Sequence, residues 1–210
     1  MSKVKIIISQ ILIFNSKKST ISGMSVKITK KEILNIACGL FREKGFDTVS
    51  LDEVCRACGI SKPTFYNYVD SKDAILTDYY DIVCQDIMMH FANVYEQDTY
   101  YKQFCTFYDI IIDGSVDLGP ELIGKMLSLN LKDDKNSFST RDHLTEIVIP
   151  LIRKGQEAGE FTDRIPAEEL YDAVNFVFLG LELKWCMKKG NVNWKTEFHR
   201  ITDALLGFKN

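Results

Sequence analysis

Several residue patterns that carry chemistry are missing from this chain of 210 residues. It has 3 histidines, and the spacing of His90, His143 and His199 matches no metal-binding motif. No glycine-rich loop of the phosphate-binding kind occurs, and no nucleophile stands with a base in a recognisable catalytic pattern. We therefore expect neither an enzyme nor a bound cofactor or metal.

Long apolar runs are also missing. The strongest one lies within Met1 to Phe14, after a basic start, and it falls short of the roughly 20 apolar residues that span a bilayer. It resembles a secretion signal only weakly, because Thr20-Ile21-Ser22 makes a poor cleavage site. Met24 opens a segment that leads directly into the first predicted helix. We therefore expect residues 1–24 to be an extension, either upstream of the true start or a separate arm.

Cysteine is present 6 times, but only Cys55 and Cys58 form a C-x-x-C pair. A redox or metal function for this pair would make the chain a thiol sensor or an enzyme. No second pair with suitable spacing exists, and both positions suit small apolar residues that pack within a helix. We expect free thiols in a reducing cytoplasm.

Charge is unevenly distributed along the chain, although the net charge is only −3. Residues 1–75 hold 12 Lys and Arg against 7 Asp and Glu, whereas residues 76–210 hold 14 against 22. With 46% hydrophobic residues the chain is able to bury a sizeable core. The positive charge of residues 1–75 and the negative charge of residues 76–210 are typical of a mildly cationic DNA- or RNA-binding domain joined to an acidic one.

Residues 50–76 contain two short helical patterns joined by a tight turn. The first follows Ser50 and ends at Gly59, and Ser61 is placed to cap a second helix that begins Lys62-Pro63. Two brief helices with a glycine turn between them form a helix-turn-helix, whose second helix enters the major groove of DNA. The pattern predicts a DNA-binding protein.

Residues 29–76 resemble the DNA-binding domain of TetR-family transcriptional regulators. The landmarks are Phe41, Gly45 and Phe46 at the end of the first helix, the Cys58-Gly59 turn, and a Ser-Lys-x-Thr segment that closes on Ser71-Lys72. Two positions depart from the family pattern, because Pro63 stands where glycine is frequent and Tyr68 where histidine is frequent. The resemblance implies an all-α fold, with a three-helix N-terminal DNA-binding domain and a larger helical domain for ligand binding and dimerisation.

The remainder of the chain reads as consecutive helices, with no alternating strand pattern and no internal repeat. The expected helices after the DNA-binding domain cover 71–97, 99–115, 119–130, 140–158, 166–189 and 194–206, with a polar loop at 131–139. We divide the chain into the extension at 1–24, the DNA-binding domain at 25–75, and the ligand-binding and dimerisation domain at 76–210.

Eight residues of the helix-turn-helix are candidates for contact with DNA. Ser50 and Ser61 cap helices whose free N–H groups suit phosphate. The two lysines and one tyrosine hydroxyl suit the phosphate backbone, and the remaining three suit base edges. The alternative for any single residue is that it only faces solvent. The full set is Ser50, Ser61, Lys62, Thr64, Tyr66, Asn67, Tyr68 and Lys72.

The larger domain has two further sets of candidates. Aromatic residues able to line a ligand pocket, or alternatively to form an ordinary core, are Tyr79, Phe91, Tyr95, Phe104, Tyr108, Phe176 and Trp185. The helix at 166–189 is apolar almost all round and so needs cover on more than one side. The residues predicted to form a four-helix dimer interface are Phe178, Leu181, Phe198 and Ile201.

We predict a cytoplasmic, ligand-responsive repressor that binds a pseudo-palindromic operator as a homodimer, with no membrane partner. Its partners would be double-stranded DNA and a small-molecule effector. The alternative is a ligand-binding co-activator or scaffold of the same fold that does not bind DNA. The modest positive charge and Pro63, which lacks an N–H for phosphate, keep this alternative open.

Overall fold

The computed structural model describes residues 28–88, 92–132 and 140–208. This part of the chain contains helices and no strand, as the sequence predicts. In chain order the helices are α2 (Lys30–Lys44), α3 (Leu51–Cys58), α4 (Lys62–Tyr66), α5 (Lys72–Met88), α6 (Ala92–Tyr95), α7 (Tyr100–Leu118), α8 (Pro120–Lys132), α9 (Thr140–Glu157), α10 (Ala167–Met187) and α11 (Trp194–Leu206).

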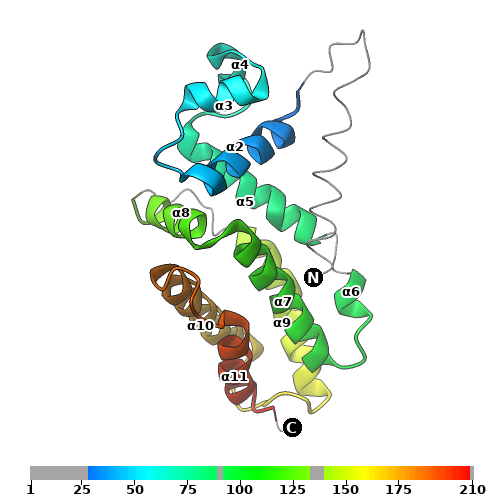
Figure 1. Ribbon diagram of the computed structural model, residues 1–210. Helices are drawn as coiled ribbons and strands as arrows, with labels where there is room; N and C mark the ends of the chain where they lie inside the picture. The colour runs from blue at the N-terminus through cyan, green and yellow to red at the C-terminus, as the bar shows by residue number, and fades with distance from the viewer. Residues whose placement is uncertain (1–27, 89–91, 133–139, 209–210) are drawn as a thin grey trace.

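The head of the molecule consists of α2, α3 and α4, and it lies at one end of the structure (Figure 1). Thr29 and Glu32 form the capping box that starts α2. Gly59 ends α3 with φ of 66°, a left-handed conformation that glycine adopts without a steric penalty. Phe41 and Phe65 are 1% and 0% exposed, so the three short helices share one core.

The body is a bundle in which α7, α9, α10 and α11 run beside one another (Figure 1). Its centre is a cluster of aromatic rings from three helices, where Tyr108 of α7, Phe178 of α10 and Phe198 of α11 meet in pairs at centroid distances of 4.7 to 6.0 Å. Such pairs add to the stabilisation that comes from burying the rings.

Helix α5 connects head and body, and it continues without a break across residues 75 and 76, the predicted boundary between the two domains. Ile75 and Leu76 are 0% and 2% exposed, so they belong to the core. The two parts therefore share one helix, and a displacement of α5 reaches both.

A second connection joins the end of α2 to the junction of α7 and α8. Lys125 of α8 forms an ion pair with Asp47 at 2.7 Å, and its ammonium lies 5.0 Å from the centroid of the Phe46 ring. The guanidinium of Arg42 donates to the carbonyl of Asp117 at 3.4 Å. We call these five residues the head–body contact.

Several predicted helix ends differ from the structure. Within the helix predicted at 71–97, the structure describes α5 and α6, and residues 89–91 between them lie outside the described residues. Gly114 lies inside α7 and interrupts nothing, because the helix ends only at Gly119 with φ of 93°. Pro166 is the N-cap of α10 and not its first helical residue. The extension at 1–24 and most of the loop at 131–139 lie outside the described residues.

Candidate nucleic-acid interface and ligand pocket

Serine caps fix the geometry of the helix-turn-helix. The Ser50 hydroxyl accepts from the backbone N–H of Glu53 at 3.2 Å, and the Ser61 hydroxyl accepts from that of Thr64 at 3.3 Å. The hydroxyls of Ser61 and Thr64 also lie 2.8 Å apart. Both helix starts form as predicted, and each cap already satisfies one N–H of its helix.

Helix α4 presents a polar face outward and an apolar face inward. Lys62, Tyr66 and Asn67 are exposed, with Tyr66 at 53%, whereas Phe65 is fully buried. Tyr68 is half-buried and packs against the head core. The outer face therefore offers a cation, a phenol and a carboxamide, which are the groups that contact phosphates and base edges in DNA.

Lys62 has a partner within the head. Its ammonium lies 2.9 Å from a carboxylate oxygen of Asp52 at the start of α3, and both side chains are well exposed. Hydrogen bonding to Asp52 raises the pKa of Lys62 above its usual value. The lysine remains a cation on the outer face, but a phosphate has to compete with Asp52 for it.

Lys72 has its own partners within the head, at the end of α2. Its ammonium donates to the carbonyl of Phe46 at 2.5 Å and lies 4.4 Å from the centroid of the Phe46 ring. Burial lowers the pKa of this lysine. The ammonium thus holds the turn after α2, and the contact of Lys72 with phosphate stays a prediction.

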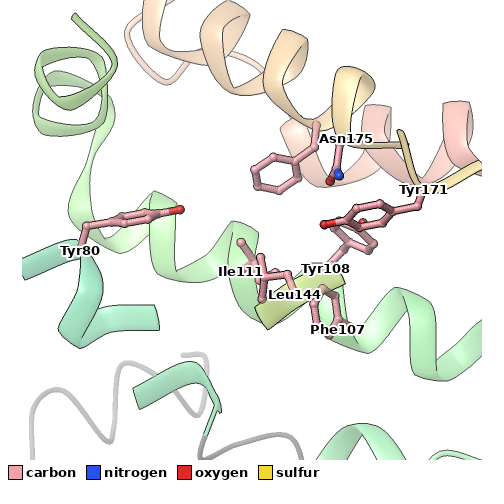
Figure 2. A pocket seen from close by; sticks show the side chains of 8 residues that line it. Tyr80, Phe107, Tyr108, Ile111, Leu144, Tyr171 and Asn175 are labelled. Carbon is pink, nitrogen blue, oxygen red and sulfur yellow. The ribbon is translucent and has the colours of Figure 1, made fainter. Parts of the chain in front are cut away.

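A pocket lies in the body between helices α5, α7, α9 and α10. Figure 2 shows Tyr80 reaching from α5 with its hydroxyl directed toward the other lining side chains. Tyr171 and Asn175, one turn apart on α10, present polar ends to the same space. The lining residues are Tyr80, Phe107, Tyr108, Ile111, Leu144, Tyr171, Asn175 and Phe178.

Of the six predicted pocket residues that the structure describes, Tyr108 alone lines this pocket. Phe104 and Trp185 lie in the core, Tyr79 is half-buried, and Phe91 is outside the described residues. Tyr95 and Phe176 are 66% and 73% exposed. The helical spacing of apolar residues predicted which side of each helix is buried. It did not predict that Asn175 lines the pocket, because Asn175 is a polar residue on an apolar helix.

The predicted dimer residues are mostly internal. Phe178, Leu181 and Phe198 are 5%, 6% and 0% exposed within one subunit, and Ile201 is half-buried. The outward side of α10 carries other apolar side chains, namely Phe176, Leu183 and Met187, which are 73%, 51% and 73% exposed. The assignment of Phe178, Leu181 and Phe198 to a partner surface is therefore wrong, because the subunit's own core covers them.

A ladder of polar contacts joins α7 to α11. The Tyr101 hydroxyl donates to Asp203 at 2.8 Å, and Lys195 lies 2.8 Å from Asp113. Between these contacts, Nε2 of His199 lies 2.7 Å from Asp109. This hydrogen bond is the main cause that raises the pKa of His199 to about 10. The charged groups on this side of α7 are thus engaged with α11.

The cysteines of the C-x-x-C pair pack within the head and are not reactive thiolates. Cys55 is 5% exposed, and burial raises the pKa of Cys58 to about 11. A thiol with such a pKa holds its proton at neutral pH. Among the described residues, no group of three or more His, Cys, Asp or Glu side chains is arranged to hold a metal ion. None of the described helices has the length and apolar character to cross a bilayer.

Comparison with known proteins places these features in a family. The model of bacterial regulatory proteins of the tetR family matches residues 33–79, which cover most of the head and the start of α5. The transcriptional regulator UidR of Escherichia coli K12 is 28% identical over 149 residues, which are 65% of this chain and 71% of UidR.

Solved structures of the family share the fold. The Thermus thermophilus repressor FadR, solved with lauroyl-CoA, superposes with a TM-score of 0.66 at 19% identity and covers 84% of this chain and 93% of its own. FadR of Bacillus halodurans gives a TM-score of 0.65 at 14% identity, with 85% and 98% covered. Head sequence, relative and fold agree, and the chain belongs to the TetR family of transcriptional regulators.

Proposed function

We propose that this regulator is a ligand-responsive repressor that binds a pseudo-palindromic operator through the outer face of α4. The exposed Lys62, Tyr66 and Asn67 carry this proposal, because they combine a phosphate contact with groups that read base edges. The fully buried Phe65 behind them holds the face in one orientation. Such a protein acts on chromosomal DNA in the cytoplasm.

The proposed operator has two half-sites, because the regulator acts as a homodimer. In helix-turn-helix dimers the recognition helices are spaced about 34 Å apart, one turn of DNA. We assign the dimer interface to the outward side of α10, where Phe176, Leu183 and Met187 leave a row of apolar side chains exposed to solvent. Large exposed apolar patches mark protein interfaces.

The pocket is the proposed effector site, and α5 is the proposed link to the head. Tyr80 lines the pocket, while Ile75 and Leu76 on the same helix lie in the core. A ligand that displaces Tyr80 moves the helix on which the head is carried. The loss of operator affinity is limited by how much more tightly the ligand binds the displaced conformation than the DNA-binding one.

A gel shift with the DNA upstream of the gene tests this function. We expect a specific complex that survives competitor DNA, and a loss of affinity of about 1–3 kcal/mol in Asn67→Ala, confined to one base pair per half-site. Lys62→Ala should weaken binding to all sequences alike. Lys102→Ala is the matched control, because this lysine lies on α7 and pairs with Asp98. No complex with any upstream fragment would favour the co-activator or scaffold that does not bind DNA.

A further inference from the structure

The chemistry of the pocket lining restricts what it is able to bind. Five of its eight residues are aromatic, and two others are Ile111 and Leu144. The polar groups that reach it are phenol hydroxyls and the carboxamide of Asn175. Among the described residues, no acidic or basic side chain lines it. The pocket thus offers ring faces and neutral hydrogen-bonding groups.

Two described carboxylates near the lining residues on α7 are paired with α11. Asp109 follows the lining residue Tyr108 in sequence, but its carboxylate pairs with His199 on α11. Asp113, one turn further along α7, pairs with Lys195. Asp172, next to Tyr171, is exposed. Against the described lining residues, a ligand carboxylate or phosphate would lose its water without gaining a cation, which is strongly unfavourable.

Tyr171 is available as a hydrogen-bond donor. Its hydroxyl oxygen accepts from the hydroxyl of Thr145 at 2.9 Å, so its own proton is left for another acceptor. Asn175, one helical turn away, adds a donor and an acceptor on the same side of the pocket. Together they suit one small polar group, such as a hydroxyl or a carbonyl oxygen.

Size is the last restriction. As it stands, the space between the lining side chains has room for about one water molecule. A ligand therefore enters only if side chains move, and Tyr80 is the lining residue on α5. A flat ring requires the least displacement for the area that it buries against aromatic walls.

We infer that this pocket takes a small, uncharged aromatic molecule with one hydroxyl or carbonyl group, of the phenol class, and rejects carboxylates and phosphate esters. The inference rests on the proposed function of the pocket as the effector site. It also sets this chain apart from any regulator that recognises an acyl-CoA, whose phosphates would find no cation among the described lining residues.

The test is a ligand-observed NMR titration of the full-length protein with three probes that share one ring. They are para-cresol, para-toluate, which carries a carboxylate in place of the hydroxyl, and toluene, which carries neither. We expect para-cresol to bind at least about tenfold more tightly than para-toluate at neutral pH, because no described lining residue supplies a cation for the carboxylate. Lauroyl-CoA should give no saturable binding.

Two variants and one control locate the binding site. Asn175→Ala removes the carboxamide without adding volume and Tyr171→Phe keeps the ring, and each should weaken para-cresol binding about threefold to tenfold, with a smaller effect on toluene binding. Tyr95→Phe, at a tyrosine that is 66% exposed outside the pocket, should change neither.

Any one of three results would overturn the inference. They are equal binding of para-toluate and para-cresol, no binding of any probe, and variants that bind para-cresol as the unchanged protein does. A gel shift on the same preparations separates this result from the proposed function. If operator binding persists while the probe order is reversed, only the assignment of the ligand class fails.

Discussion

Replacing Phe176 with glutamate tests whether the outward side of α10 holds the two subunits together. The ring is 73% exposed in the single subunit and contributes little to its core. Glutamate at this site should leave the subunit folded, because the side chain meets water in the monomer. In the dimer, two carboxylates would be brought to one apolar interface, once from each subunit.

The expected effect follows from the exposed area. A phenylalanine side chain buries about 200 Å², and 73% of that leaves about 150 Å² for a partner to cover. At about 25 cal/mol per Å² this amounts to about 4 kcal/mol per subunit, and the two-fold axis doubles it. Even half of the total raises the dissociation constant of the dimer by more than about 100-fold.

Sedimentation velocity at micromolar concentration is the assay, with circular dichroism as the measure of folding. The variant should sediment as a helical monomer and lose tight operator binding, since one head makes half of the contacts. Tyr95→Glu is the matched control, because it also places a carboxylate at an exposed aromatic residue, on α6. A Phe176→Glu protein that remains a dimer would refute the assignment of the interface to this side of α10.

Three further changes test the packing and the connections of the fold. Gly155→Ala should destabilise the protein by about 1–3 kcal/mol in urea unfolding, because its new Cβ would lie 2.2 Å from the ring of Phe161; Gly39→Ala, with no atom within 4 Å, should not. His199→Gln should lower the melting temperature most below about pH 6 and progressively less toward pH 10, because a raised pKa stabilises the protonated, folded form; an equal effect at all pH values would contradict this. Lys125→Met removes the ion pair of the head–body contact and should reduce operator affinity severalfold in a gel shift. The free energy of unfolding should change by less than about 1 kcal/mol, because exposed ion pairs stabilise little.

Local signals in the sequence predicted the head well. Thr29, Ser50 and Ser61 each cap the helix assigned to them, because a cap depends only on residues within one turn. Gly59 takes the left-handed conformation that ends α3 for the same reason. The contact of Lys72 with the carbonyl and the ring of Phe46 had no local signal, since only the tertiary fold brings these groups close.

The body was harder to predict because one helix has two apolar sides. The sequence of α10 indicates that both sides are covered, but it does not distinguish the side that meets the subunit's own core from the side that remains open. Phe178 and Phe176 are two residues apart, yet they are 5% and 73% exposed. The packing of α7 and α11 decides between them, and this packing is not encoded in the local pattern of α10.

The ion pair between Lys62 and Asp52 has a consequence for how operator binding responds to salt. A lysine that meets a phosphate normally releases a condensed counterion, and this release makes binding salt-dependent. Here Asp52 already serves as a tethered counterion, at 2.9 Å from the ammonium. When DNA arrives, the phosphate displaces a carboxylate that stays with the protein, so fewer ions enter solution. Lys62 should therefore contribute less than a full charge to the salt dependence, and Asp52→Asn should both tighten operator binding and make it steeper in salt.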